Sequence, residues 1–332
     1  MRKGKRLIAW IMAVVMLFTI CVFGGNGTAE AAATTPVAKH GRLSVKGADL
    51  VDSKGNKFQL RGISTHGINW DVGSPYVNKK AFKTLRDDWG VNAIRLAMYT
   101  EEYNGYCSGG SQAKLRKLVD KGVGYATDLG MYAIIDWHIL SDGNPNKNKS
   151  QAKKFFTTMA KKYKNNKNVI YEICNEPNGC SWKEIKSYAT DIIKTIRKYD
   201  KKAVIIVGTP TWSQLGTDGT SNEVADSPIK GYKNIMYSLH FYASEWAHNE
   251  YLPAKVAYAR KKKLPIIVSE FGLSPASGDG AINKASADKW MKLLNKYNIS
   301  YFCWSLSNKN ESASLLKPST KKTSSWKSGD LS

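Results

Sequence analysis

Cysteine is scarce in this sequence. Only five of the 332 residues are cysteines, and the first, Cys21, lies in an apolar run near the N-terminus. The other four are too few for a domain held together by disulfides, and no Cys/His spacing matches a zinc site. Cys174 and Cys303 lie in apolar runs, which favours buried thiols. Cys107 and Cys180 lie in Gly-rich segments, so one bridge between them is a hypothesis.

Acidic side chains are few compared with basic ones. The chain has 27 Asp and Glu against 50 Lys and Arg, which gives a net charge of +23. Such an excess is found in nucleic-acid-binding proteins. The lysines here are spread along amphipathic helical stretches such as "QAKKFFTTMAKKYKNNKN", a pattern typical of a solvated surface. Nucleic-acid binding therefore rests on charge alone, and we expect no nucleic-acid partner.

Long apolar runs are also rare, and the single one is "LIAWIMAVVMLFTICVF" at residues 7–23. A basic start precedes it and small residues follow it, which is the pattern of a secretory signal. The alternative is an uncleaved anchor, but the run is slightly short of the roughly 20 residues that span a bilayer. We predict a signal peptide at 1–33 and a secreted, extracellular domain at 34–332 with no membrane association after cleavage.

A Gly-rich phosphate loop after an early strand is absent, which disfavours an open doubly wound sheet. Eight β-rich runs alternate instead with amphipathic helical segments, and this order predicts a parallel sheet. Eight is the number of strands that closes a (β/α)8 TIM barrel, so we predict that α/β fold. The expected strands are 59–64, 91–98, 132–138, 169–175, 203–209, 235–242, 265–272 and 301–306.

A short hairpin is predicted ahead of the barrel. The segment "LSVKGADLVDSKGNKF" (43–58) alternates in polarity and contains a Lys-Gly-Asn turn. We expect this N-terminal β-hairpin to close the bottom of the barrel.

Polar and aromatic residues collect where the predicted strands end. Functional groups of TIM barrels lie at these C-terminal ends, and three of the five histidines fall there. The residues at or near the strand exits are His66, Arg95, Tyr99, Trp137, His138, Asn175, Glu176, Trp212, His240, Tyr242, Glu270 and Trp304.

Glu172 lies inside the apolar stretch "NVIYEICNEP". Side chains of a strand alternate between the two faces of the sheet. If Glu176 faces the barrel mouth and no bulge intervenes, Cys174 and Glu172 face the interior. A buried lone charge is costly, so Glu172 must be either protonated or paired with a cation. Arg61 and Arg95 are the candidates.

The same counting applies to two later strands. It places Ile266, Val268 and Glu270 together on one face, and His240 with Tyr242 on another common face.

Glu176 and Glu270 match the needs of glycoside hydrolysis, which uses two carboxyl groups that converge on a cleft. One must be an acid with a raised pKa, and the other must stay ionised to attack the anomeric carbon. Arg95 and Tyr242 are placed to keep Glu270 ionised. Asn175 is placed to bind the sugar 2-hydroxyl.

Tryptophan is plentiful, with ten in the chain. Trp70, Trp212 and Trp304 offer flat faces on which sugar rings can stack, and the alternative for each is core packing. The number of tryptophans at loop positions favours a sugar cleft.

These motifs resemble the bacterial endo-β-1,4-glucanases (cellulases) of glycoside hydrolase family 5 over roughly residues 40–330. The paired Asn-Glu-Pro and later Glu at strand ends are specific to this family in combination. The stretches that carry the resemblance are "RGISTHG", "NAIRLAMY", "DWHIL", "YEICNEPNG", "GTPTWSQ", "HFYA", "VSEFG" and "WSLSNKNES".

The resemblance implies a retaining double displacement, with Glu176 as acid/base and Glu270 as nucleophile. It implies a polar catalytic shell of Arg95, His138, Asn175, His240 and Tyr242. It implies sugar contacts from His66, Trp70, Tyr99, Trp212, Trp304 and Lys309. It also implies that no metal or other cofactor is needed. We expect a monomer that cuts internal bonds of cellulose and related β-glucans.

Two alternatives stay open. The same machinery can act on β-mannan or xyloglucan, because specificity depends on loop shape. A non-catalytic carbohydrate-binding barrel is a different class of function, and the presence of both carboxylates argues against it.

Overall fold

The computed structural model describes residues 34–332, so the predicted signal peptide lies outside the described residues. Among the residues described, no helix is both long and apolar enough to cross a membrane.

Eight parallel strands close into a barrel, which confirms the predicted TIM-barrel fold. The strand order around the barrel is β10-β3-β4-β5-β6-β7-β8-β9, so neighbours in sequence are neighbours in space. Every predicted strand overlaps an observed one. The strands are β3 (Arg61–Thr65), β4 (Ala93–Tyr99), β5 (Tyr132–His138), β6 (Val169–Glu172), β7 (Ile205–Val207), β8 (Ile235–Tyr242), β9 (Ile266–Gly272) and β10 (Tyr301–Leu306).

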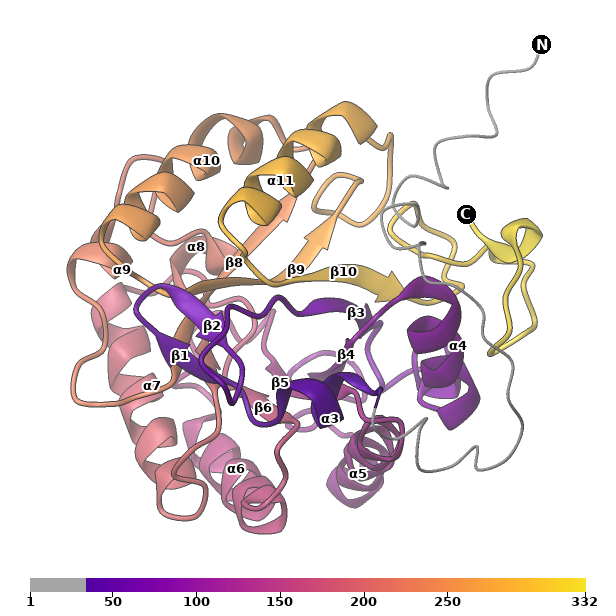
Figure 1. Cartoon of the computed structure of the whole chain (residues 1–332), viewed down its shortest axis with the longest axis horizontal. Coiled ribbons are helices and arrows are strands. Elements are labelled where there is room, and N and C mark those ends of the chain that lie inside the picture. The colour runs from indigo at the N-terminus through magenta and orange to yellow at the C-terminus, as the bar shows by residue number, and fades with distance from the viewer. Residues whose placement is uncertain (1–33) are drawn as a thin grey trace.

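Helices form a ring around the barrel (Figure 1). The long ones are α4 (Lys79–Trp89), α5 (Gln112–Asp128), α6 (Lys149–Tyr163), α7 (Trp182–Arg197), α10 (Trp246–Lys261) and α11 (Lys284–Lys296). After β7 the chain forms two short helices, α8 (Pro210–Ser213) and α9 (Glu223–Asp226), and after β10 it runs to the 3-10 turn η2 (Ser328–Asp330). A second 3-10 turn, η1 (Ser74–Tyr76), precedes α4.

Helix α7 illustrates how the sequence specifies this ring. Ser181 and Glu184 form a reciprocal capping box that satisfies free backbone N–H groups at the start of the helix. Apolar residues then recur every three or four positions and pack on the barrel. The buried apolar residues of the helix are Trp182, Ile185, Tyr188, Ala189, Ile192, Ile193 and Ile196.

The hairpin below the barrel is confirmed. Helix α3 (Pro36–His40) leads into β1 (Ser44–Lys46), which pairs antiparallel with β2 (Asp49–Val51). The turn lies at residues 47–48, and not at the Lys-Gly-Asn sequence. That sequence makes a second turn that sets Lys57 opposite Val51.

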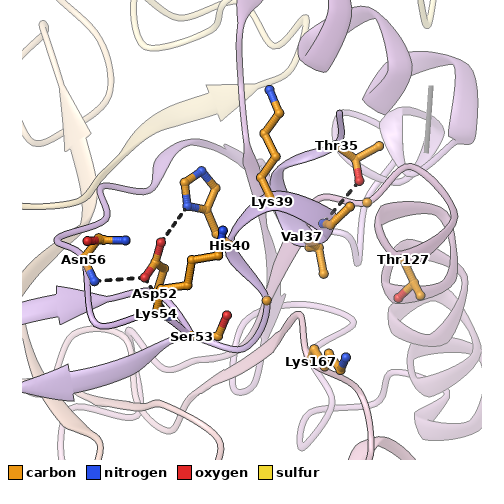
Figure 2. Close-up of a pocket in the computed structure, with 13 residues that line it drawn as sticks. Thr35, Val37, Lys39, His40, Asp52, Ser53, Lys54, Asn56, Thr127 and Lys167 are labelled. Atoms are coloured by element: carbon orange, nitrogen blue, oxygen red, sulfur yellow. Dashed lines mark hydrogen bonds and ion pairs between the residues drawn. The ribbon is translucent and has the colours of Figure 1, made fainter. Parts of the chain in front are cut away.

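A contact between Asp52 and His40 fastens the hairpin segment to α3. The carboxylate of Asp52 accepts hydrogen bonds from the backbone N–H groups of Lys54 and Asn56, both at 2.9 Å. It also lies 3.1 Å from Nδ1 of His40 (Figure 2). The second turn is therefore held by a carboxylate as well as by its own backbone.

The lower part of the barrel interior is an apolar core. Residues from all eight strands or the segments leading into them point inward there, and the hairpin segment covers them from below. This buried cluster consists of Leu43, Leu50, Phe58, Leu60, Ala93, Tyr132, Ile134, Ile170, Val204, Ile206, Met236, Ile267 and Phe302. The prediction that the hairpin closes the bottom is therefore correct.

The cysteine hypothesis is wrong in this structure. Cys107 and Cys180 are free thiols and half-buried. Burial raises the pKa of Cys107 to about 12 and that of Cys180 to about 11. Cys174 is a buried thiol, as expected, but it packs in the cluster between barrel and helices and does not face the barrel interior. Strand β6 ends at Glu172, so alternation does not extend to residue 174. Cys303, which was also expected to be buried, is only half-buried.

A β-bulge in β9 changes which of its side chains face the interior. Ser238 of β8 pairs with Ile267 of β9, and His240 of β8 pairs with Glu270 of β9. Between these two pairs the chain advances two residues in β8 but three in β9. Strand β9 therefore contains one extra residue, and the register to β10 shifts at the same place. Such a bulge re-aims the side chains that follow it.

The bulge overturns the predicted alternation. Ile266 and Val268 pack outward against the helices, whereas the hydroxyl of Ser269 and the carboxylate of Glu270 both contact interior groups. Glu270 therefore faces the barrel mouth although Val268, two residues before it, faces away.

Candidate active site

Arg95 is the centre of a buried polar network in the upper barrel. It lies on β4 and is fully buried. Its Nε donates to Glu172 Oε2 at 2.7 Å, one Nη donates to Glu270 at 2.9 Å, and the other donates to Asn175 at 2.6 Å. Asp136 lies 3.1 Å from the same guanidinium. One cation thus faces three carboxyl groups, which explains how so many charges can be buried.

The partner of Glu172 is therefore Arg95, one of the two predicted candidates. Arg61 is exposed and bonds Gln59 instead. Glu172 also accepts a hydrogen bond from Ser269 at 2.6 Å, so both of its oxygens have partners.

Glu270 is held by two donors, as predicted. Arg95 reaches Oε2 at 2.9 Å, and the hydroxyl of Tyr242 donates to Oε1 at 2.7 Å. Tyr242 and His240 lie on one face of β8, which confirms that part of the alternation. Both oxygens of the carboxylate are therefore held in place by hydrogen bonds.

Glu176 has a different environment, just beyond β6. Its side chain is 13% exposed, and Oε1 lies 2.8 Å from Nδ1 of His240. Burial raises the pKa of Glu176 to about 8; Asp136 and Glu172 add to this rise, and Arg95 opposes it. The two carboxyl groups thus differ in the way that an acid and a nucleophile require.

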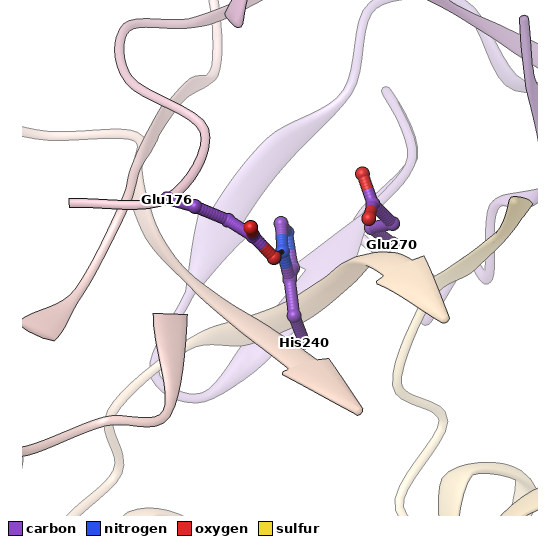
Figure 3. A group of neighbouring side chains, drawn as sticks. All are labelled: Glu176, His240 and Glu270. Atoms are coloured by element: carbon purple, nitrogen blue, oxygen red, sulfur yellow. Dashed lines mark hydrogen bonds and ion pairs between the residues drawn. The ribbon is translucent and has the colours of Figure 1, made fainter. Parts of the chain in front are cut away.

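The two glutamates approach each other across the barrel mouth (Figure 3). One carboxylate oxygen of each and one ring nitrogen of His240 all lie within 4.8 Å of one another. Among the described residues, this trio is the group of side chains able to reach a common metal ion. Both oxygens of Glu270 already accept hydrogen bonds from Arg95 and Tyr242, so the arrangement favours an acid pair over a metal site.

His138 and Asn175 form the next part of the network. The amide of Asn175 accepts from Arg95 through Oδ1, and its Nδ2 lies 3.2 Å from Nε2 of His138. Because Nδ2 is a donor, Nε2 accepts, and Nδ1 of His138 carries the hydrogen and donates to Asp136 at 2.6 Å. Burial and Arg95 lower the pKa of His138 to about 3, so the ring is neutral.

Asp136 and Ser269 were not among the predicted site residues. Asp136 carries the same signal as Glu172, a carboxylate inside an apolar strand, and lies two residues before His138 on the same face. Ser269 carries no such signal, because strict alternation places it opposite Glu270.

An aromatic wall lines one side of the mouth. Trp70 packs on Tyr99 with ring centroids 4.6 Å apart, and Trp304 stacks on His138 at 5.3 Å and 19°. The ring of His66 lies 5.2 Å from that of Trp304. The structure thus brings four of the six predicted sugar-contacting residues together, and their contact with sugar stays a prediction.

Trp212 makes no ring contact with this wall among the described residues, whereas Lys309 is linked to it through Glu311, which lies 3.6 Å from Nε2 of His66. Trp212 is 44% exposed, and its backbone N–H donates to the carbonyl of Pro177, next to Glu176. Its φ of 53° is in the left-handed region, which is uncommon for a side chain of this size. The ammonium of Lys309 lies 2.5 Å from Glu311, a buried carboxylate that sequence reasoning missed.

The sequence between residues 51 and 310 matches the family model described as cellulase (glycosyl hydrolase family 5). The chain belongs to glycosyl hydrolase family 5. It is a glycoside hydrolase of the cellulase type.

Two curated relatives named endoglucanase support the assignment. Endoglucanase A from Butyrivibrio fibrisolvens is 46% identical over 297 residues, covering 88% of this chain and 66% of the relative. An endoglucanase from Clostridium saccharobutylicum is 46% identical over 332 residues, covering 98% and 70%. The chain thus spans about two thirds of the length of these two relatives.

Solved structures give the same result. The catalytic domain of the Thermobifida fusca endoglucanase Cel5A, in complex with cellotetraose, matches with a TM-score of 0.81 and 37% identity, covering 90% of this chain and 95% of that one. The cellulase Cel5C_n matches with a TM-score of 0.81 and 40% identity, covering 86% and 87%.

Proposed function

We propose that this chain is a secreted endo-β-1,4-glucanase that cleaves internal β-1,4-glucosidic bonds of cellulose and related β-glucans with retention of configuration. The observation that carries the proposal is that one carboxylate oxygen of Glu176 and one of Glu270 lie within 4.8 Å of each other at the barrel mouth, which is short of the spacing that an intervening water needs. Retaining glycosidases hold their carboxyl groups about 5–5.5 Å apart, whereas inverting enzymes need about 6.5–9.5 Å to admit a water. The relatives named endoglucanase support the substrate class.

In the first step, Glu270 attacks the anomeric carbon while Glu176 gives its proton to the glycosidic oxygen. The bond from carbon to the leaving oxygen breaks, and a bond from carbon to Glu270 forms. The donors Arg95 and Tyr242 hold one oxygen each, so they keep the carboxylate of Glu270 in a fixed orientation. The raised pKa of Glu176 keeps it protonated near neutral pH.

In the second step, water displaces Glu270 from the sugar. Glu176, now ionised, removes a proton from that water and so regains its acid form. Two inversions at the same carbon give net retention. Asn175 is anchored by Arg95 and by its Nδ2 bonds to His138 and the Ile139 carbonyl, so its amide is fixed where the sugar 2-hydroxyl is expected.

The aromatic side chains supply the sugar-binding surface of this proposal. Trp70, Tyr99 and Trp304 form a continuous wall on one side of the mouth. Trp212 lies beside the segment that carries Glu176, the group that protonates the leaving oxygen. We therefore assign Trp212 to the leaving-group side of the cleft.

A polysaccharide panel tests the function. The protein would be incubated with carboxymethylcellulose, mixed-linkage β-glucan, β-mannan and xyloglucan, with Glu270→Ala as the matched control. We expect the two β-glucans to release reducing sugar fastest, and NMR to show the β-anomer first. Faster release from mannan or xyloglucan would favour the alternative substrates. Binding without release by the unaltered protein would favour a non-catalytic barrel.

The proposed mechanism uses no metal or cofactor, and it needs one chain. We therefore propose a monomer that acts outside the cell on soluble or accessible β-glucan. Activity should survive a chelator, and the mass in solution should be that of a single chain. Loss of activity with the chelator, restored by a divalent cation, would show that the carboxylate and histidine trio binds a metal.

A further inference from the structure

A continuous chain of hydrogen bonds connects Glu176 with the buried Glu172. Oε1 of Glu176 lies 2.8 Å from Nδ1 of His240, Nε2 of His240 lies 2.9 Å from Oγ of Ser269, and Oγ of Ser269 lies 2.6 Å from Oε1 of Glu172. His240, Ser269 and Glu172 are all buried. The bulge in β9 lets Ser269 and Glu270, which are neighbours in sequence, both face the interior, so this chain runs beside the second glutamate.

We propose that Ser269 is a positioning residue that fixes the tautomer of His240 and thereby keeps the proton on Glu176 in the resting enzyme. The proposal rests on the role of Glu176 as the acid. Ser269 acts through His240 and does not contact Glu176 in the structure.

The hydroxyl of Ser269 has three hydrogen-bond partners, and one assignment of donors and acceptors satisfies all three. Besides His240 and Glu172, it lies 2.6 Å from Oγ of Ser238. A hydroxyl supplies one hydrogen and two lone pairs. Burial and Asp136 raise the pKa of Glu172, but the guanidinium of Arg95 binds its other oxygen and opposes this rise, which favours a carboxylate that can only accept. Ser269 therefore donates to Glu172 and accepts from Ser238 and His240.

It follows that Nε2 of His240 carries the hydrogen. Burial lowers the pKa of His240 to about 4, so the ring is neutral and Nδ1 has a lone pair. The 2.8 Å contact to Glu176 is then a hydrogen bond only if Glu176 is the donor. An ionised Glu176 would face that lone pair, so this tautomer favours the protonated acid.

Other charged groups face His240 and Glu176, and some raise the pKa of Glu176 whereas others lower it. Asp136 and Glu172 raise the pKa of Glu176, and Arg95 lowers it. Glu270, paired with Arg95, lies across the mouth. Glu172 also lies 4.0 Å from Nε2 of His240, so its charge favours a hydrogen on the same nitrogen, and Ser269 supplies the hydrogen bond that this nitrogen makes.

The competing arrangement reverses the donor and acceptor of each hydrogen bond between Glu172 and Glu176. A proton on Glu172 would let Ser269 donate to Nε2 of His240, and Nδ1–H would then donate to an ionised Glu176. That state places a neutral carboxyl beside Arg95 and leaves the resting enzyme without its acid. The two polarities differ in which nitrogen of one ring carries a hydrogen, which is directly measurable.

The deciding experiment is long-range ¹H–¹⁵N NMR of the ¹⁵N-histidine-labelled protein near neutral pH, with the His240 signals identified by their loss in His240→Gln. We expect a protonated-type Nε2 and an unprotonated Nδ1. The reverse pattern, or a mixture, would overturn the proposal. This readout needs no turnover, so it stands even if the function of Glu176 is wrong.

Variants test the link to the acid. In Ser269→Ala the tautomer should become mixed, and Nδ1–H should stabilise ionised Glu176. The alkaline limb of kcat/KM on polysaccharide should then move down by about one pH unit, with little change on an activated aryl cellobioside. Ser269→Thr keeps the hydroxyl and should restore the limb, and Ser238→Ala should leave the tautomer unmoved.

A merely structural role predicts a different result. Ser269→Ala would then lower kcat/KM equally for both substrates and leave the alkaline limb of the pH profile in place. This outcome would overturn the proposal. If Ser269→Ala does not fold, as judged by circular dichroism, the tautomer of the unaltered protein and of Ser269→Thr still decides the question. A Glu176→Gln variant with full activity would refute the proposed function instead.

Discussion

The lower and upper halves of the barrel interior are built from the same strands but contain opposite kinds of side chain. Strand β5 shows the contrast, because Tyr132 and Ile134 belong to the apolar lower core, whereas Asp136 and His138 belong to the polar network. All four face the interior. The difference shows that burial alone does not decide polarity; position along the strand relative to the barrel mouth does.

The two halves are stabilised by different physics. The lower half excludes water and gains free energy from apolar burial and close packing. The upper half buries charges that are tolerable only as a paired set around Arg95. We therefore expect substitutions in the upper half to affect chemistry most, and substitutions in the lower half to affect stability most.

The largest effect on chemistry is expected for Glu270→Ala. Without the nucleophile the covalent step cannot occur, so turnover should vanish while the fold, by circular dichroism, is kept. Added azide should enter the vacated space and restore part of the activity, giving a product of inverted configuration. Unchanged turnover, or azide rescue with retention, would contradict the role of Glu270.

Glu176→Gln should have the next largest effect, and it should depend on the leaving group. Loss of general acid catalysis should slow polysaccharide cleavage by roughly 10²–10⁴-fold, and an activated aryl glycoside much less. The unaltered enzyme should lose activity as pH rises through the raised pKa of Glu176, about 8, because the acid form is lost there. An equal slowing of both substrates would argue against the acid role.

Phe302→Ala tests the lower half. The ring is fully buried and fills the space above Gly62, where an added Cβ would lie 2.1 Å from it. Its removal should lower the free energy of unfolding by about 3–5 kcal/mol, and kcat well below the melting temperature should change little. Phe302→Leu is the control and should cost less. A large fall in kcat with unchanged stability would break the division between the halves.

Trp212→Ala should have the smallest effect of the four. The side chain is 44% exposed, so stability should hardly change. Loss of one stacking face should raise KM for cello-oligosaccharides by an amount equivalent to about 0.5–1.5 kcal/mol, measured by steady-state kinetics. Trp246→Ala, at a still more exposed tryptophan, is a matched control that should leave KM closer to that of the unaltered protein. An unchanged KM in Trp212→Ala would remove this residue from the proposed cleft.

The sequence predicted the parts of this molecule that depend on local pattern. Alternation of β-rich and helical segments was enough to find all eight strands and the barrel. The strand exits correctly placed Glu176, Glu270 and the donors of Glu270, because in a parallel barrel all C-terminal ends meet at one mouth. The need of a buried carboxylate for a cation reduced the partner of Glu172 to two candidates, Arg61 and Arg95, and the structure shows that it is Arg95.

The features that were missed depend on contacts between distant segments. The bulge in β9 is a mismatch of register with β8, which no alternation inside β9 reveals, and it hid the inward position of Ser269. Glu311 lies in a loop whose path is set by tertiary packing. The predicted bridge between Cys107 and Cys180 relied on Gly-rich surroundings, which say nothing about the distance between two loops.

The most direct test of the central claim is to trap the covalent intermediate. The protein would be treated with a 2-deoxy-2-fluoro-β-cellobiosyl fluoride, digested, and the labelled peptide identified by mass spectrometry. The account predicts one label per chain, on Glu270, with Glu176→Gln still labelled because fluoride needs little acid assistance. A label on Glu176, or none on a catalytically active protein, would contradict it.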